Sequence, residues 1–207
     1  PYEDFNMSVS TTAAVLEFLR QFAPKARFVF PSSAAVYGNQ HKNQLKEDLA
    51  TGPFSPYGFH KLMAEQLCLS AMQNFNLHCR IVRFFSLYGT GLRKQLLWDA
   101  SNKLIDAKGV ALEFFGTGDE LRDWVHVSDA AKLIKVVAEN VSSPVVINGG
   151  SGESVAVHSV VEKLRDLINP GAPISFNGQV REGDPKCLVA DNQLALAIGW
   201  LPEVTLE

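Results

Sequence analysis

The sequence predicts an α/β fold built on a parallel sheet, and two observations carry that prediction. Short runs of apolar and β-branched residues, such as 27–31, have the composition of strands buried on both faces. Longer segments in which apolar residues recur at helical spacing, such as 8–22 and 56–75, alternate with those runs along the chain. This alternation is typical of a sheet whose strands are joined by helices.

The first half of the chain contains two predicted helices and two predicted strands. In order, they are a helix over 8–22, a strand over 27–31, a helix over 56–75 and a strand over 78–84. Pro24 ends the first helix, and Ser33 comes at the carboxyl end of the first strand. Ser55 is the expected N-cap of the long helix, because Pro56 occupies the first helical position that proline favours.

The second half continues the alternation with shorter elements. The predicted helices cover 95–106, 128–139, 155–167 and 192–198, and the predicted strands cover 112–114 and 145–148. Glycine and polar residues become more frequent over 149–154, which indicates a boundary between two lobes.

Composition excludes several classes of function. The chain has 207 residues, 46% of them hydrophobic, and a formal net charge of -3. Its basic residues are scattered and form no stripe that would follow a phosphate backbone, so we expect no nucleic-acid partner. No apolar stretch approaches the roughly 20 residues needed to cross a bilayer, and no signal segment opens the chain, so we expect a cytoplasmic protein without membrane contact.

The cysteines indicate neither a disulfide framework nor a metal site. Cys68, Cys79 and Cys187 are odd in number, far apart and in no Cys-x-x-Cys pair. The histidines have no partners at metal-ligand spacing either. We therefore expect reduced cysteines that pack in the interior, and no bound metal.

Serine, tyrosine and lysine side chains occur in two motifs that the predicted fold can bring together. Ser33 lies at a strand end, and Tyr57 and Lys61 are four residues apart at the start of the long helix. Such a pair shares one helix face, and it is also a common pattern of solvated residues. Because a nearby ammonium group stabilises a phenolate, we expect Lys61 to lower the pKa of Tyr57. Tyr57 would then act as a base on a substrate hydroxyl, with Ser33 relaying the proton.

The two motifs resemble the active-site segments of a known family. Ser-Ser-Ala-Ala-Val-Tyr-Gly (32–38) and Ser-Pro-Tyr-Gly-Phe-His-Lys (55–61) are similar to those of extended short-chain dehydrogenases/reductases, especially UDP-glucose 4-epimerases. The resemblance implies a partial Rossmann-type, doubly wound parallel sheet with a smaller α/β substrate-binding lobe, and NAD as cofactor. It implies catalytic roles for Ser33, Tyr57 and Lys61, and cofactor contacts at Ser32, Tyr57, Lys61 and Phe84.

Three further segments extend the resemblance to the substrate side. They are Arg-Phe-Phe-Ser-Leu-Tyr-Gly-Thr-Gly (83–91), Gly-Thr-Gly-Asp-Glu-Leu-Arg-Asp (116–123) and Arg-Glu-Gly-Asp-Pro (181–185). The resemblance implies that a nucleotide-sugar substrate contacts Ser33, Ser86, Arg122, Arg181 and Asp184. Two guanidinium groups suit a pyrophosphate, because arginine binds oxyanions through two parallel hydrogen bonds. The alternative for either arginine is a surface ion pair with Glu120, Asp123 or Asp184.

The sequence also departs from the family's pattern. No Gly-rich turn that would cradle a dinucleotide pyrophosphate precedes 27–33, so we expect an N-terminally truncated chain whose first strands are missing. On this interpretation 1–86 and 124–150 are the remainder of the dinucleotide-binding domain, and 87–123 and 151–207 form the substrate-binding lobe. We also expect such a fragment to be inactive alone, with an apolar strand edge left unpaired.

The function that the resemblance implies is NAD-dependent epimerisation of a UDP-hexose through a transient keto-sugar. Ala34 and Ala35 stand where dehydratases and decarboxylases carry acidic residues, which favours simple oxidation and re-reduction. A nucleotide-sugar reductase or dehydrogenase, or an inactive fragment, stays open as an alternative. The helices over 8–22 and 57–75 resemble the family's dimer-forming bundle, so we expect a homodimer. The sequence identifies neither the sugar nor the choice between NAD and NADP.

Overall fold

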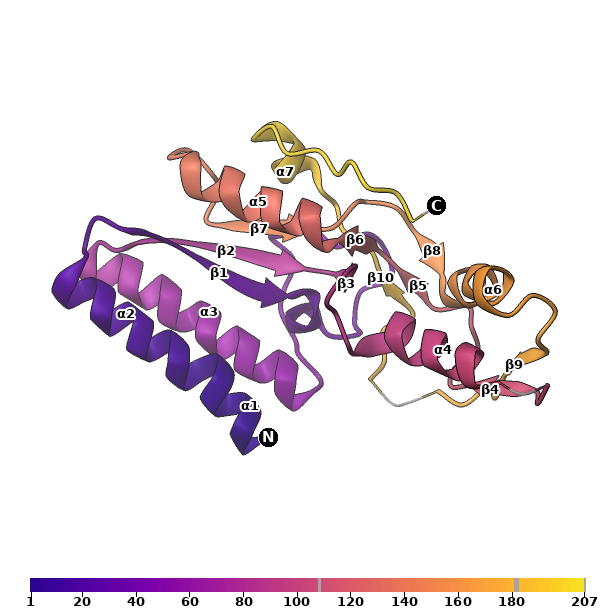
Figure 1. Ribbon diagram of the computed structural model, residues 1–207. Coiled ribbons are helices and arrows are strands. Elements are labelled where there is room, and N and C mark those ends of the chain that lie inside the picture. The colour runs from indigo at the N-terminus through magenta and orange to yellow at the C-terminus, as the bar shows by residue number, and fades with distance from the viewer. Residues whose placement is uncertain (108, 181–182, 207) are drawn as a thin grey trace.

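The computed structural model describes residues 1–107, 109–180 and 183–206, and its centre is a parallel sheet. The sheet has the strand order β1-β2-β7, formed by β1 (Arg27–Ser33), β2 (His78–Phe84) and β7 (Val146–Gly149). Helices cover both of its faces (Figure 1). This arrangement confirms the predicted α/β fold with a parallel sheet.

One face of the sheet is covered by the N-terminal helices and by α3 (Pro56–Phe75). α1 (Tyr2–Phe5), a π-helical turn (Asn6–Ser10) and α2 (Thr11–Phe22) follow one another without a break in helical backbone. The helix therefore begins earlier than the predicted residue 8, because a π turn shifts the helical phase and hides the preceding turn from a 3.6-residue pattern. Leu16, Cys68 and Ile81 belong to the apolar core on this face.

The opposite face carries α5 (Val127–Glu139) and α7 (Gln193–Ala197). Its core contains Val82, Leu133 and Ile147, and Trp200 packs among them with a 2% exposed side chain. The indole Nε1 donates to the backbone oxygen of Asp129 over 2.9 Å. The last part of the chain thus packs on the sheet, although the predicted division assigned 151–207 to the other lobe. The remainder of that division stays a prediction.

Beyond the carboxyl ends of β1 and β2, the chain forms a second region of short elements (Figure 1). It contains the helices α4 (Gln95–Asp106) and α6 (Val157–Ile168), which pack on one another. Its strands are β4 (Leu112–Phe114), β5 (Leu121–Arg122), β8 (Val155–Ala156), β9 (Ile174–Phe176) and β10 (Cys187–Leu188). β3 (Ser86–Tyr88) pairs with β6 (Trp124–His126) where the two regions meet. Sequence periodicity found only β4, because a strand of two or three residues has no readable period.

The sequence located the long elements closely. The predicted boundaries of α3, β2 and α4 agree with the structure, and β1 extends to Ser33. The Ser55 side chain accepts a hydrogen bond from the Gly58 amide, as expected of the N-cap. No helix among the described residues is long and apolar enough to span a bilayer.

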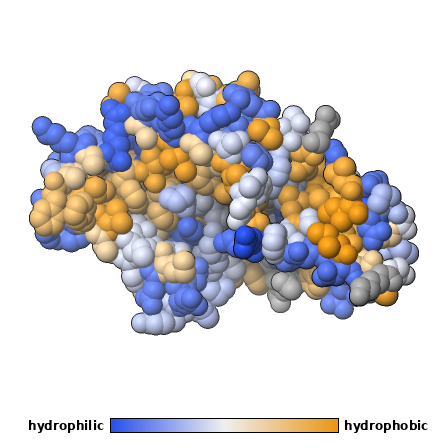
Figure 2. Space-filling view, in the orientation of Figure 1, coloured by the Kyte–Doolittle hydropathy of each residue, from blue (hydrophilic) through white to orange (hydrophobic). Residues whose placement is uncertain are grey.

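Large apolar side chains remain on the surface beside the N-terminal helices. Figure 2 shows an apolar area at the end of the molecule where α2 ends. Phe18, Phe22 and Phe75 are 57%, 71% and 55% exposed. Exposed apolar groups of this size are typical of a surface that contacts another molecule.

Candidate active site

The end of β1 brings Ser33 together with the first turns of α3. The Tyr57 side chain lies close enough to Ser33 for the serine to lower its pKa, and Lys61 lies one helical turn further along. Lys61 Nζ donates to the Pro31 backbone oxygen over 2.9 Å and lies 5.8 Å from the centroid of the Tyr57 ring. Ser33 Oγ also accepts from the Ala35 amide over 3.2 Å, which fixes the serine at the start of a short helical turn. The three predicted catalytic residues are therefore neighbours, and we call this group the strand-end site.

Protonation in the strand-end site differs from the expectation. Partial burial raises the pKa of Tyr57, while its hydrogen bond with Ser33 lowers it and the negative charge of Asp4 raises it. Burial lowers the pKa of Lys61, with Asp4 raising it and Lys94 lowering it. The predicted lowering of the Tyr57 pKa by Lys61 is wrong for the chain in this state, because the ammonium group is bound to Pro31. The phenol therefore keeps its proton at neutral pH.

The side chains of two residues predicted to contact the cofactor are buried in the interior of the protein. The Ser32 side chain is 4% exposed and donates to Glu65 Oε1 over 2.5 Å on the α3 face of the sheet. The Phe84 ring is 6% exposed and lies against Gly149 in the core on the α5 face. Strand alternation turns these side chains into the two cores, so a cofactor could reach only their backbone atoms. A cofactor contact at Ser32 and Phe84 stays a prediction, restricted to their backbone atoms.

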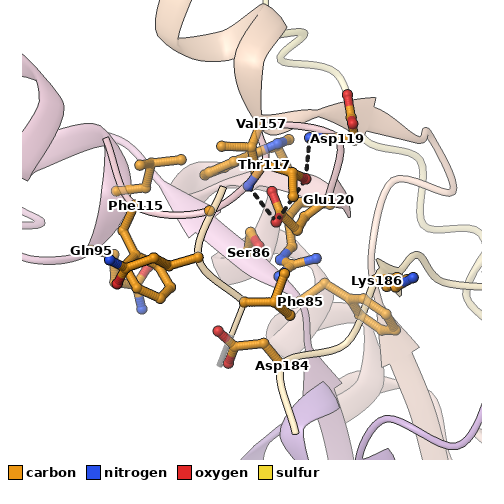
Figure 3. A pocket seen from close by; sticks show the side chains of 16 residues that line it. Phe85, Ser86, Gln95, Phe115, Thr117, Asp119, Glu120, Val157, Asp184 and Lys186 are labelled. Carbon is orange, nitrogen blue, oxygen red and sulfur yellow. Dashed lines mark hydrogen bonds between the residues drawn. The ribbon is translucent and has the colours of Figure 1, made fainter. Parts of the chain in front are cut away.

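A cavity of about 510 Å³ opens where β2 continues into β3 (Figure 3). Ser33 is paired in register with Phe84, and the next two residues, Phe85 and Ser86, form part of the cavity wall. Other wall residues come from α4, from β5 and the turn before it, and from the segment before β10, and they include Gln95, Phe115, Thr117, Glu120, Arg122, Asp184 and Lys186. The cavity thus begins beside the strand-end site and extends into the second region.

Arg122 is the cavity's half-buried guanidinium group. Its Nη1 donates to the backbone oxygens of Leu121 and Pro185 over 2.9 and 2.8 Å. Burial lowers the Arg122 pKa, and the nearby charges of Glu120 and Asp184 raise it. Among the described residues, no carboxylate comes within ion-pair distance of this group. A guanidinium held by carbonyl oxygens keeps donors free for an anion in the cavity.

Glu120 and Asp123, two of the acidic residues considered as ion-pair partners of Arg122, have hydrogen-bond partners of their own. Glu120 accepts from the amides of Thr117 and Gly118 and from the Thr117 hydroxyl (Figure 3). Asp123 is fully buried and accepts from the amides of Ser151, Gly152 and Ala190. It therefore closes the turn after β7 and does not neutralise Arg122. Arg122 therefore forms none of the predicted ion pairs within the part of the chain that the structure describes, and the same alternative for Arg181 lies outside it.

The remaining predicted substrate contacts divide between the cavity and an undescribed segment. Ser86 and Asp184 line the cavity with Arg122, as the sequence grouped them. Arg181 lies outside the described residues. Sequence reasoning missed Phe115, which lies in a turn without a pattern of its own, and Gln95, because the predicted start of α4 does not show which way its first side chain points. In the ranges 1–107, 109–180 and 183–206, no three potential metal ligands gather into a site.

Comparisons with known proteins agree with this geometry. The family model described as "NAD dependent epimerase/dehydratase family" matches residues 1–150. A UDP-glucose 4-epimerase of Azospirillum brasilense is 32% identical over 197 residues, which cover 86% of this chain and 56% of that protein. A UDP-glucose 4-epimerase of Corynebacterium glutamicum is 28% identical, over 99% of this chain and 67% of that protein.

Solved structures share the fold. A UDP-glucuronic acid 4-epimerase of Bacillus cereus, in complex with UDP-glucuronic acid and NAD, superposes with a TM-score of 0.85 at 26% identity. The match covers 96% of this chain and 63% of that one. MoeE5, in complex with UDP-glucuronic acid and NAD, gives a TM-score of 0.83 at 30% identity, over 96% of this chain and 67% of that one. This chain thus spans little more than half of the first relative and about two thirds of these structures.

Proposed function

Because the chain belongs to the NAD-dependent epimerase/dehydratase family, we propose that it carries the catalytic and substrate-binding part of a UDP-sugar 4-epimerase. The observation that carries this proposal is the proximity of Tyr57 and Ser33 at the end of β1, whose neighbouring strand β2 leads into Phe85 and Ser86 in the wall of the cavity that contains Arg122. A hydroxyl group to be oxidised would lie at the strand-end site, and the nucleotide diphosphate in the cavity.

Tyr57 is the group that exchanges a proton with the substrate. Its phenolate takes the proton of the sugar hydroxyl during oxidation, and the phenol so formed returns that proton during reduction, while Ser33 hydrogen-bonds the same oxygen. The raised pKa of Tyr57 means that a positive charge must come closer before the phenol acts as a base. Lys61 is placed to supply that charge once it leaves the Pro31 carbonyl.

NAD, the family's cofactor, fits this site at its nicotinamide end. NAD supplies hydride transfer, which no side chain can perform. The Tyr57 hydroxyl and the Lys61 amine lie near Ser33 and Pro31 at the carboxyl end of β1, and both can bind a ribose. The sequence has no Gly-rich turn before β1, so its described residues provide no cradle for the pyrophosphate.

An epimerase is favoured over a dehydratase by the residues after Ser33. Eliminating water requires an additional proton-transfer group near the sugar. Ala34 is 1% exposed, and neither it nor Ala35 can exchange a proton. These side chains therefore support oxidation followed by re-reduction, and they leave elimination without an acid at this position.

A homodimer fits the exposed apolar surface of the N-terminal helices. Phe18 and Phe22 on α2 and Phe75 on α3 would be covered if two copies packed these helices together. The proposal predicts a dimeric sedimentation mass for the protein expressed from its complete reading frame. A monomeric mass would contradict it.

The test of the function is turnover of UDP-glucose, UDP-N-acetylglucosamine and UDP-glucuronic acid with NAD by the protein from its complete reading frame. Tyr57→Phe should abolish turnover, because it removes the exchangeable proton, while Tyr2→Phe changes an exposed phenol and should leave turnover intact. Net consumption of NADH or NADPH would indicate a reductase instead. No turnover with any of the three sugars would contradict the epimerase proposal.

A further inference from the structure

A buried carboxylate lies directly behind the strand-end site. Glu65 of α3 is 1% exposed, and its two oxygens accept three hydrogen bonds. Ser32 Oγ donates to Oε1 over 2.5 Å, and Arg83 donates from Nε to Oε1 over 3.0 Å and from Nη2 to Oε2 over 2.8 Å. A buried carboxylate is stable only while such partners stay in place. The position of Glu65 is therefore fixed by β1 and β2 together.

Arg83 extends this arrangement to the third strand of the sheet. Its Nη1 donates to the Glu47 backbone oxygen over 3.2 Å, and its guanidinium carbon lies 4.8 Å from the Tyr37 ring centroid. The Tyr37 hydroxyl donates to Asn148 Oδ1 over 2.7 Å, at the end of β7. Every donor and acceptor in this chain of contacts has a partner, and such networks are rigid. The carboxyl ends of β1, β2 and β7 are thus joined through one ion pair.

Glu65 shares its helix face with the two catalytic candidates of α3. Tyr57, Lys61 and Glu65 follow one another at intervals of four residues, so they lie in one row along the helix. The row meets three consecutive residues of β1. Lys61 donates to the Pro31 carbonyl, Glu65 accepts from Ser32, and Tyr57 lies near enough to Ser33 for the serine to lower its pKa.

We propose that Glu65, held by Arg83, is a positioning residue that sets the distance between the Tyr57 hydroxyl and Ser33. The two hydroxyls lie on different elements, and Glu65 bonds the residue next to Ser33 from the helix that carries Tyr57. A shift of α3 along β1 would therefore break the Ser32 bond and the Tyr57 contact together. This inference rests on the proposed function, in which both hydroxyls bind one substrate oxygen.

The test measures the titration of residue 57 without substrate. The 207-residue chain is prepared with 3,5-difluorotyrosine in place of Tyr57, because fluorine lowers the pKa of the phenol and gives a single ¹⁹F NMR signal. Glu65→Asp keeps the charge but withdraws the carboxylate by about 1.5 Å, the length of one carbon–carbon bond. Ser32→Ala removes only the hydroxyl and leaves the ion pair intact. Glu17→Asp is the matched control, since Glu17 pairs with Arg20 on the exposed face of α2.

The proximity of Ser33 lowers the pKa of Tyr57, so a larger distance between the two hydroxyls should raise the midpoint of the fluorinated phenol. We expect a rise of about 0.5 pH unit or more in Glu65→Asp, a smaller rise in Ser32→Ala and none in Glu17→Asp. Circular dichroism identifies variants that fold, and Ser32→Ala decides the question if Glu65→Asp does not. An unchanged midpoint in the folded variants would overturn the inference. The proposed function can fail separately, because this titration involves no sugar and no turnover.

Discussion

The strand-end site and the cavity beside it differ in the elements that hold them. Ser33 and Tyr57 lie on a strand of seven residues and a helix of twenty, whose contacts join residues far apart in the sequence. Arg122 lies on a strand of two residues, and its described bonds are to backbone oxygens. A long element fixes a side chain through the core beneath it, whereas a short one depends on its own turn. We therefore expect substitutions in the core to change the geometry of the strand-end site. We expect a bound ligand to change the geometry of the cavity.

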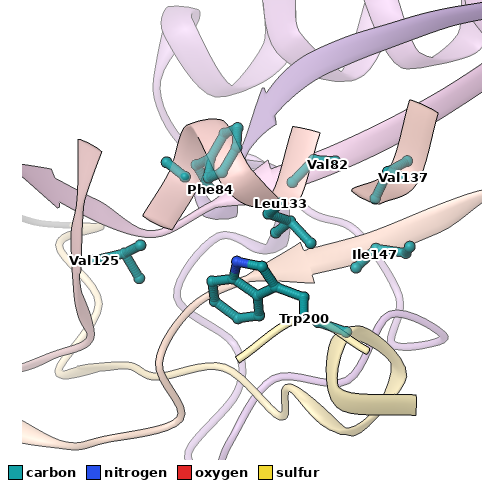
Figure 4. Packing of buried hydrophobic residues seen from close by; sticks show 9 residues of the cluster. Val82, Phe84, Val125, Leu133, Val137, Ile147 and Trp200 are labelled. Atoms are coloured by element: carbon teal, nitrogen blue, oxygen red, sulfur yellow. The ribbon is translucent and has the colours of Figure 1, made fainter. Parts of the chain in front are cut away.

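The largest effect on stability is expected from Trp200, in the core beneath the sheet (Figure 4). Its side chain is 2% exposed, so Trp200→Ala leaves a cavity and should lower the free energy of unfolding by about 3–5 kcal/mol. Trp98 of α4, in the second region, is 40% exposed, and Trp98→Ala should cost much less. Urea unfolding of the two variants measures the difference. Equal losses would mean that the two regions are equally well packed.

The second expected effect is a dependence of the free energy of unfolding on pH, caused by Tyr37 in the network that joins the strands of the sheet. Burial raises the pKa of Tyr37 to about 12, although Arg83 opposes the rise, while an unfolded tyrosine titrates near 10. The folded state thus holds a proton that the unfolded state releases. The resulting stabilisation is complete below about pH 10 and is lost as the pH rises to about 12, by about 2–3 kcal/mol.

Tyr37→Phe tests this dependence, because phenylalanine cannot ionise. The variant should be less stable at neutral pH, since it loses the bond to Asn148, but its stability should fall less between about pH 9 and about pH 11.5. Tyr2→Phe, at a 79% exposed position, should follow the unchanged chain. Parallel curves for all three proteins would show that Tyr37 does not cause the alkaline loss.

The third effect concerns the cavity. Arg122→Gln removes the guanidinium while keeping a polar side chain, and it should weaken binding of UDP by roughly 10- to 100-fold, the loss of a charge-assisted hydrogen bond. Arg165→Gln changes a partly buried arginine of α6 that pairs with Asp166 outside the cavity wall, and it should have no effect. Calorimetric titration gives both affinities. An unchanged affinity in Arg122→Gln would remove the cavity from the proposed substrate site.

The sequence predicts the strand-end site better than it predicts the cavity. The pattern of α3 and the proline after Ser55 located the helix that carries Tyr57 and Lys61, because long amphipathic helices leave a strong signal. The network behind them was missed, although Glu65 lies four residues after Lys61 and could have been found from that spacing. In the cavity wall, resemblance pointed to Ser86, Arg122 and Asp184, whereas Phe115 in a turn and Gln95 at the start of α4 were missed. The pKa of Tyr57 depends on whether the Lys61 ammonium group binds the Pro31 carbonyl or lies beside the phenol, and no sequence pattern shows which of the two occurs.

The smallest effect compares one backbone position from each region. Gln95 at the start of α4 has φ of 70°, and Asn76 after α3 has φ of 56°. Asparagine tolerates this left-handed conformation, whereas glutamine is strained in it. Gln95→Gly should therefore stabilise the chain by about 0.5–1 kcal/mol, because relief of strain exceeds the added entropy of the unfolded state. Asn76→Gly should change stability by only a few tenths of a kcal/mol, roughly the difference between two residues that both accept this backbone. Thermal unfolding measures the change in stability of each variant. A larger gain in Asn76→Gly than in Gln95→Gly would mean that the greater backbone strain lies in the sheet region and not at the start of α4.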